Sequence, residues 1–109
     1  MVNAPFTPSG NSVVFTAAAS APTAVRAISN TLGANQYRVI NSGTVLVFMG
    51  VGVTASEASN NAVTVTFSQN SIPLLPGTDE ILTFTPNAYF TGIAASGTAV
   101  IYITPGDGA

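Results

Sequence analysis

The residues able to do chemistry are few in this chain, and their types exclude most catalytic mechanisms. The sequence contains no His and no Cys, and its two basic residues are Arg26 and Arg38. A serine nucleophile would therefore lack the imidazole or lysine that usually activates it, and Schiff-base chemistry would lack its amine. Zinc and other transition metals likewise lose their usual nitrogen and sulfur ligands. We expect neither a cofactor nor a transition-metal site.

Carboxylates are the remaining candidates for acid–base chemistry. They are Glu57, Asp79, Glu80 and Asp107. Asp79 and Glu80 are neighbours, so in a strand they point to opposite faces and do not form a catalytic pair with each other. A glycosidase needs two carboxylates about 5 to 10 Å apart across one cleft, and nothing in this spacing predicts such a pair. A calcium loop of the Asp-x-Asp-x-Asp-Gly type is also absent from the sequence. We therefore predict that the protein is not an enzyme and holds no metal.

The low charge of the chain is its most unusual property. Charged residues make up 6% of the sequence, with a formal net charge of −2, against about 25% in an average soluble domain. Arg26 and Arg38 are too few to neutralise a phosphate backbone, so nucleic-acid binding is not expected. They lie on adjacent expected strands, and pairing with Asp79 or with an acidic residue of a partner is favoured. A nearly neutral surface gives little charge repulsion between molecules. The low charge therefore predicts that neighbouring subunits cover this surface.

Neither a membrane nor an export route is indicated. The N-terminal residues show neither the basic start nor the apolar run of a signal peptide. The longest mostly apolar stretch, from Val45 to Val53, is far shorter than the about twenty residues of a spanning helix. Absence of Cys fits assembly in a reducing cytoplasm.

The fold class follows from strand-forming residues that are regularly interrupted by turn residues. Val, Thr, Ala, Ser, Gly and Ile dominate the sequence, whereas strong helix formers are scarce. Short strands are predicted at residues 12–18, 23–29, 36–41, 44–53, 62–68, 71–75, 79–85, 89–95 and 98–104. Eight or nine strands at this spacing indicate one all-β domain over residues 12–109, an antiparallel β-sandwich of jelly-roll type.

Local signals refine this prediction. Residues 41–44, Asn-Ser-Gly-Thr, are typical of a tight hairpin turn, because Asn and Gly tolerate a positive φ. Residues 62–68 alternate between apolar and polar side chains, as a half-buried strand does. Pro73 favours an edge position for its strand. Residues 57–61 are the one place where a short helical turn is compatible with the sequence.

Some predicted strands are apolar on both faces, notably residues 45–51, Ile81 with Leu82, and Val100 with Ile101. The outer face of such a strand must be covered by a loop, by the N-terminal segment or by another subunit. Gly50 and Gly52 predict a bulge or a close backbone approach on one of these strands.

Residues 1–11, with two Pro and a Gly, are expected to form an extended arm outside the packed sheet. The predicted contacts with a partner are aromatic and basic residues: Phe6, Arg26, Arg38, Tyr89 and Phe90. The alternative is a carbohydrate-binding module, for which Tyr37, Tyr89 and Phe90 are the candidate aromatics in a chain without Trp.

Two segments, residues 36–45 and 101–106, resemble parts of short phage virion proteins. With its low charge and lack of Cys, the chain resembles the small decoration or cement proteins of tailed-phage heads over residues 25–106. The resemblance implies a jelly-roll virion protein, assembled in the host cytoplasm, that binds the outer surface of the capsid. There it would staple neighbouring major capsid protein subunits as a dimer or trimer. A carbohydrate-binding or receptor-binding module of a phage fibre or tail is the alternative.

Overall fold

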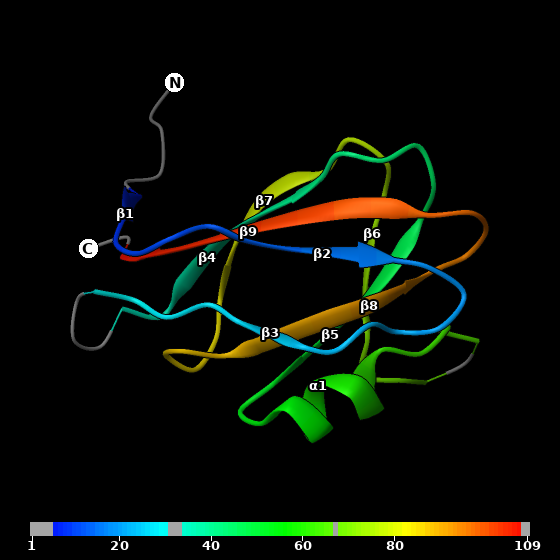
Figure 1. Ribbon diagram of the computed structural model, residues 1–109, viewed down its shortest axis with the longest axis horizontal. Helices are drawn as coiled ribbons and strands as arrows, with labels where there is room; N and C mark the ends of the chain where they lie inside the picture. The colour runs from blue at the N-terminus through cyan, green and yellow to red at the C-terminus, as the bar shows by residue number, and fades with distance from the viewer. Residues whose placement is uncertain (1–5, 31–33, 67, 108–109) are drawn as a thin grey trace.

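A computed structural model describes residues 6–30, 34–66 and 68–107. Two antiparallel sheets pack face to face, and one short helix lies against the second sheet (Figure 1). The elements in chain order are β1 (Thr7–Pro8), β2 (Val13–Ala17), β3 (Val25–Arg26), β4 (Gln36–Asn41), β5 (Val47–Gly52), α1 (Ala55–Asn61), β6 (Ile72–Leu74), β7 (Asp79–Thr83), β8 (Tyr89–Ala94) and β9 (Ala99–Asp107). The all-β sandwich predicted from the sequence is confirmed.

The strand order is that of a jelly roll. The first sheet runs β2–β9–β4–β7, with β1 pairing along the same edge of β9 as β2, and the second runs β3–β8–β5–β6. From β2 onward, successive strands change sheets, except that β5 and β6 are neighbours in the second sheet. The predicted edge position of Pro73 is confirmed, because β6 is the last strand of its sheet.

The core lies between the two sheets and is built by alternate residues of each strand. Its large members are Phe15, Tyr37, Val39, Ile101 and Ile103 from the first sheet and Val47, Met49, Leu74 and Phe90 from the second. Burial of each such side chain contributes about 1.5–3 kcal/mol relative to exposure. Because these side chains point into the core, the residues between them in each strand point to the outer face of their sheet.

Two predicted segments differ from the structure. The described residues of 62–68 form no strand: they return from α1 to β6, and Ser71 Oγ donates to Val63 O within this loop. The alternating pattern was misleading because the described residues of this segment form the loop between α1 and β6 and pair with no strand. The 41–44 segment begins a crossing from β4 in one sheet to β5 in the other, so it is not a hairpin turn. Phe67 and residues 1–5 of the predicted arm lie outside the described residues.

Residues 7 and 8 of the predicted arm join the first sheet, contrary to the expectation of an arm outside it. Thr7 and Pro8 pair with Asp107 and Gly106 of the same chain. Strand β9 extends to Asp107, beyond its predicted end at residue 104, and so offers these residues a partner.

Helix α1 covers the outer side of the second sheet. Thr54 Oγ1 caps it by accepting a hydrogen bond from Glu57 N (3.1 Å), while Glu57 Oε1 accepts one from Val53 N (3.2 Å). This is close to a capping box, and it gives Glu57 a structural role. The helix packs against β5 (Figure 1), so a part of this chain covers the doubly apolar strand predicted at 45–51.

Tyr37 joins the core to the loop before β8. Its hydroxyl donates to Thr85 O and accepts from Ala88 N at 3.0 Å, and its ring meets Phe90 edge-to-face at 4.9 Å. Burial raises the pKa of Tyr37 above its usual value of 10.0.

Replacing Tyr37 by Phe is expected to lower the free energy of unfolding by about 1–3 kcal/mol, because the buried Ala88 N–H loses its acceptor. The raised pKa also means that the unfolded chain ionises first, so wild-type stability falls as pH rises above about 10. Urea denaturation at pH 7 to 11 checks both points. An unchanged stability at pH 7, or the same alkaline decline in Tyr37→Phe, would contradict this role.

Candidate interaction surface

The outer face of the first sheet is a surface that the described residues leave open. Strand register places Val14, Tyr102, Ile40 and Asp79 in one row across β2, β9, β4 and β7. Val14 is 49% and Tyr102 45% exposed, so two large apolar side chains face solvent side by side. We call this face, from β2 to β7, the outer face. No helix covers it within residues 6–30, 34–66 and 68–107, whereas α1 covers the second sheet.

A second row continues the outer face beside the first. Register aligns Thr104, Arg38 and Ile81 across β9, β4 and β7. Ile81 is 39% exposed, and Val100 lies two residues from Tyr102 on the same side of β9. These rows explain the doubly apolar pairs at 81–82 and 100–101: one residue of each pair faces the core and the other faces outward.

Arg38 and Asp79 form the charged element of the outer face. Arg38 Nε lies 2.9 Å from Asp79 Oδ1 and Nη2 lies 2.6 Å from Oδ2, with both side chains half-exposed. The hydrogen bond from Arg38 holds the pKa of Asp79 below its usual value, so the carboxylate is charged at neutral pH. The predicted pairing with Asp79 is confirmed. Because the two charges neutralise each other, the pair leaves the face without net charge.

Arg26 lies on the other sheet, so the two arginines do not form one positive patch. Its guanidinium sits 5.1 Å from the centre of the Tyr89 ring, and its Nε donates to Asn87 O at 3.0 Å. Arg26 is exposed, and Tyr89 lies half-buried beneath it. This cation–π pair leaves the face of the Tyr89 ring covered by a side chain of its own chain.

One predicted contact residue, Phe90, turns inward, which corrects the expectation that it contacts a partner, and Phe6 packs in part against its own chain. Phe90 is buried in the core, because it follows Tyr89 in β8 and adjacent residues of a strand point to opposite faces. Phe6 is half-buried and packs on Gly106 of the same chain; a Cβ at Gly106 would lie 2.5 Å from the Phe6 ring. Phe6 therefore anchors the N-terminal segment to its own sheet.

The sequence did not identify the residues of the outer face as candidate contacts. These residues are Val14, Ile40, Ile81 and Tyr102. Their signal was present in the doubly apolar strands, but alternation alone does not say which member of a pair faces out. That choice depends on strand register and on which sheet receives the covering helix.

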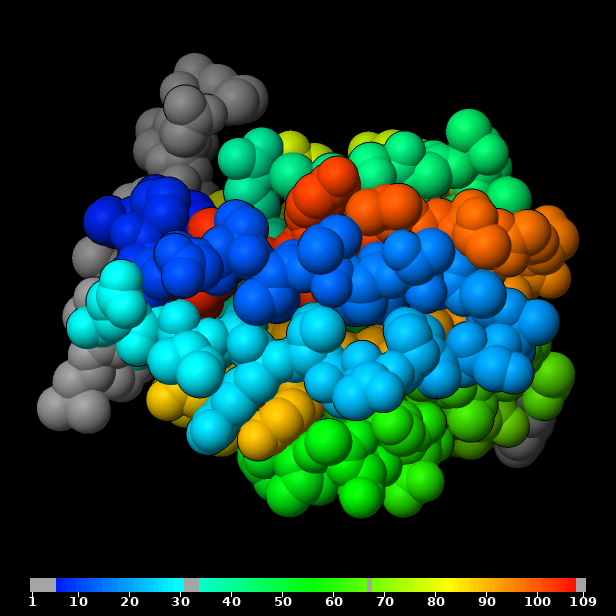
Figure 2. Space-filling view, viewed as in Figure 1, coloured from blue at the N-terminus to red at the C-terminus, as the bar shows by residue number. Residues whose placement is uncertain are grey.

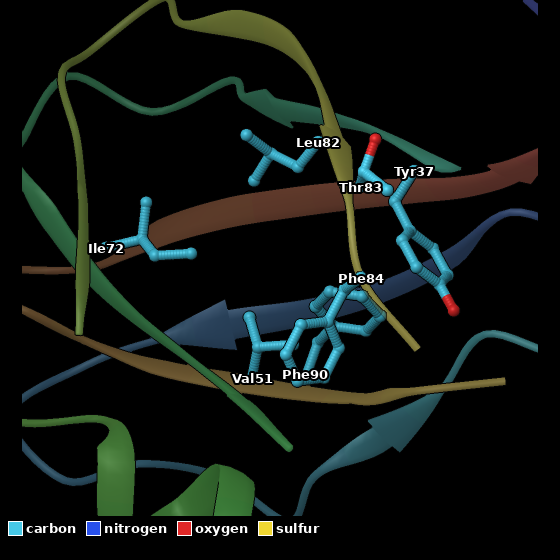
Figure 3. A pocket seen from close by; sticks show the side chains of 7 residues that line it. All are labelled: Tyr37, Val51, Ile72, Leu82, Thr83, Phe84 and Phe90. Atoms are coloured by element: carbon cyan, nitrogen blue, oxygen red, sulfur yellow. The ribbon is translucent and has the colours of Figure 1, made fainter. Parts of the chain in front are cut away.

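An apolar pocket lies between the sheets at the side of β7 (Figure 3). Its volume is about 130 Å³, and its lining comes from both sheets: Tyr37, Val51, Ile72, Leu82, Thr83, Phe84 and Phe90. Thr83 and Phe84 stand at the exposed side of the pocket. None of these side chains is an acid, a base or an ionised nucleophile at neutral pH.

Neither a metal site nor a membrane-spanning helix is found among the described residues. In the described part of the chain, no group of three His, Cys, Asp or Glu side chains is placed to hold a metal ion. The same residues contain no helix that is long and apolar enough to cross a membrane.

Comparison with known proteins identifies no relative: no family model, no curated protein and no solved structure matches this chain.

Proposed function

We propose that this protein is a structural virion subunit, a decoration or cement protein that binds the outer surface of a phage head. The observation that carries the proposal is the outer face, where the exposed Val14, Tyr102 and Ile81 share one side of the sheet with an ion pair that neutralises itself. Burial of exposed apolar side chains without unpaired charge is how stable protein interfaces gain free energy. The partner is the major capsid protein, and many identical contacts would stabilise the shell by mass action. Self-association as a dimer or trimer remains a prediction.

The carbohydrate-binding alternative has less support from the residues predicted for it. Tyr37 and Phe90 are buried, and Arg26 covers the ring of Tyr89. A sugar platform requires an open aromatic face, which these three residues do not offer.

The test is addition of the purified chain to undecorated heads of the phage that encodes it, followed by sedimentation of the particles. Saturable binding at a fixed number of copies per particle is expected. Absence of the chain from the pelleted heads, together with specific retention on a glycan array, would instead favour the fibre or tail module.

The Tyr102→Lys variant tests the outer face directly. An aromatic residue at the centre of an interface often contributes about 2 kcal/mol or more, and an added charge must also be desolvated. We therefore expect binding to heads to weaken at least about tenfold, with stability nearly unchanged because Tyr102 is exposed.

Thr23→Lys is the matched control, because Thr23 is exposed and lies two residues before β3 of the other sheet. It adds the same charge away from the outer face and should bind heads like the wild type. Equal binding by Tyr102→Lys and Thr23→Lys would contradict the proposed interface.

A further inference from the structure

Strand β7 leaves one row of backbone groups open. Phe84 N donates to Asn35 O at 2.8 Å, and Asn41 N donates to Thr78 O at 2.9 Å, both toward the β4 side. Because such bonds alternate along an antiparallel pair, residues 78, 80, 82 and 84 face β4. The N–H and C=O groups of residues 79, 81 and 83 therefore point away from the sheet, where the described residues provide no further strand.

The other edges of the two sheets are shorter or flanked by the chain itself. Strand β3 has two residues, and β6 has three with Pro73 at its centre. Strand β2 is flanked by the segment that leads through β3, which lies beside it across this side of the molecule (Figure 2). Strand β7 contacts β4 extensively and is exposed along most of its length. Folded proteins normally cover or charge such an edge, and among the described residues Asp79 and Glu80 are the charged side chains along β7.

The apolar pocket opens beside this edge and has the size of one side chain. Figure 3 shows Leu82 and Thr83 on β7 and Phe84 directly after it, with Val51 and Ile72 across from them. Its volume of about 130 Å³ is close to that of a cavity that holds a benzene-sized molecule, about 150 Å³. It is well below the about 300 Å³ of the smallest usual ligand pockets. A single Leu, Ile or Val side chain suits it better than a free ligand does.

We infer that the β7 edge binds an extended segment of a partner protein as an added antiparallel strand. Open backbone groups would supply the affinity, and the pocket would select an apolar side chain. On the inner side, the added strand places alternate residues opposite Phe84, Leu82 and Glu80, which favours the pattern apolar-x-apolar-x-basic. The inference rests on the proposed function only in requiring that the partner is a protein. It adds the kind of segment that this partner contributes, an extended strand with the stated side-chain pattern.

A second copy of this chain fits the edge less well. Two copies of β7 can pair antiparallel in more than one register. If Ile81 pairs with Ile81 of the second copy, Glu80 lies opposite the apolar Leu82. If Leu82 pairs with Leu82, Glu80 lies opposite Phe84. The chain has no cation to spare for Glu80, because Arg38 is bound to Asp79 and Arg26 lies on the other sheet. A basic residue must therefore come from a different protein.

The probe is a capped peptide, Thr-Val-Thr-Leu-Thr-Arg-Thr, titrated into the full-length ¹⁵N-labelled protein. We expect shifts of the amide signals of Ile81 and Thr83 and slower hydrogen exchange at these two amides. A peptide with Asp in place of the central Leu should bind at least about tenfold more weakly, because the pocket would receive a carboxylate. Saturation without these amide shifts would overturn the inference.

Two variants of the protein sharpen the test. Ile81→Pro removes an N–H that β4 does not use, so the sheet should persist while peptide affinity falls at least about tenfold. Thr16→Pro places the same ring on the outer edge of β2 and should bind the peptide normally. Glu80→Lys should weaken binding about threefold and reverse the preference toward a peptide with Glu in place of Arg.

Binding to phage heads separates failure of this inference from failure of the proposed function. If Ile81→Pro binds heads and peptide as well as the wild type does, the β7 edge is not the binding site, although the decoration function stands. If the wild type binds the peptide but not the heads, the edge is confirmed and the decoration function fails. Concentration-dependent dimers that disappear in Ile81→Pro would assign the edge to a second copy and overturn the inference.

Discussion

Gly50→Ala is expected to lower the free energy of unfolding by about 3 kcal/mol, at the upper end of the cost of overpacking. A Cβ at Gly50 would lie 2.1 Å from Ala58 O and 2.5 Å from Ala62 N, both backbone atoms at or beside α1. Backbone cannot rotate aside as a side chain can, so α1 must move away from β5 or β5 must bend. Either shift exposes the apolar outer side of β5, including Phe48, which is buried in the native fold.

Gly97→Ala is the control for this variant. Gly97 has a φ of +65° with no atom within 4 Å of an added Cβ, so its substitution costs only backbone strain, about 1–2 kcal/mol. Chemical denaturation of both variants gives the comparison. If Gly50→Ala is no less stable than Gly97→Ala, the tight packing of α1 on β5 is not what stabilises this side of the sandwich.

Asn41→Ala is expected to destabilise the fold by a similar amount, about 3 kcal/mol, through lost hydrogen bonds. The side chain is buried; its Nδ2 donates to Val45 O (3.1 Å) and Leu74 O (3.0 Å), and its Oδ1 accepts from Gly43 N (3.0 Å). Each buried group left without a partner costs about 1–3 kcal/mol. These bonds tie the end of β4 in one sheet to the end of β6 in the other.

Asn60→Ala provides the matched control, because Asn60 is exposed on α1 and its loss should change stability by less than about 0.5 kcal/mol. The free energy of unfolding from urea titration is the measurement for both. Equal stabilities of the two variants would show that Asn41 does not link the sheets.

The sequence predicts strand positions well here, because alternation and turn residues act locally. Strand β4 was placed at its observed bounds, and the other eight predicted strands include seven that overlap an observed one. Residues 62–66 mislead for a non-local reason: their alternation is real, but they form the loop from α1 to β6 and pair with no strand of either sheet. The role of Asn41 was also out of reach, because its partners Val45 and Leu74 meet it only after the sheets pack.

The candidate surface was less predictable than the fold. The ion pair between Arg38 and Asp79 could be expected from the sequence, because a chain with only two basic residues tends to pair each of them with a carboxylate. By contrast, Phe90 and Tyr89 look equivalent in sequence, and only strand orientation puts Phe90 in the core and Tyr89 under Arg26. Tyr102 has the same ambiguity and lies outward.

Hydroxyl-radical footprinting of the chain bound to heads tests the proposed interface most directly, because the two half-exposed tyrosines lie on opposite sheets. Tyr102 reports on the outer face and Tyr89 on the β3–β8 side, so each serves as the internal control for the other. We expect oxidation of Tyr102 to fall several-fold on binding while oxidation of Tyr89 stays unchanged. Protection of Tyr89 with Tyr102 still fully reactive would contradict the outer face as the binding surface.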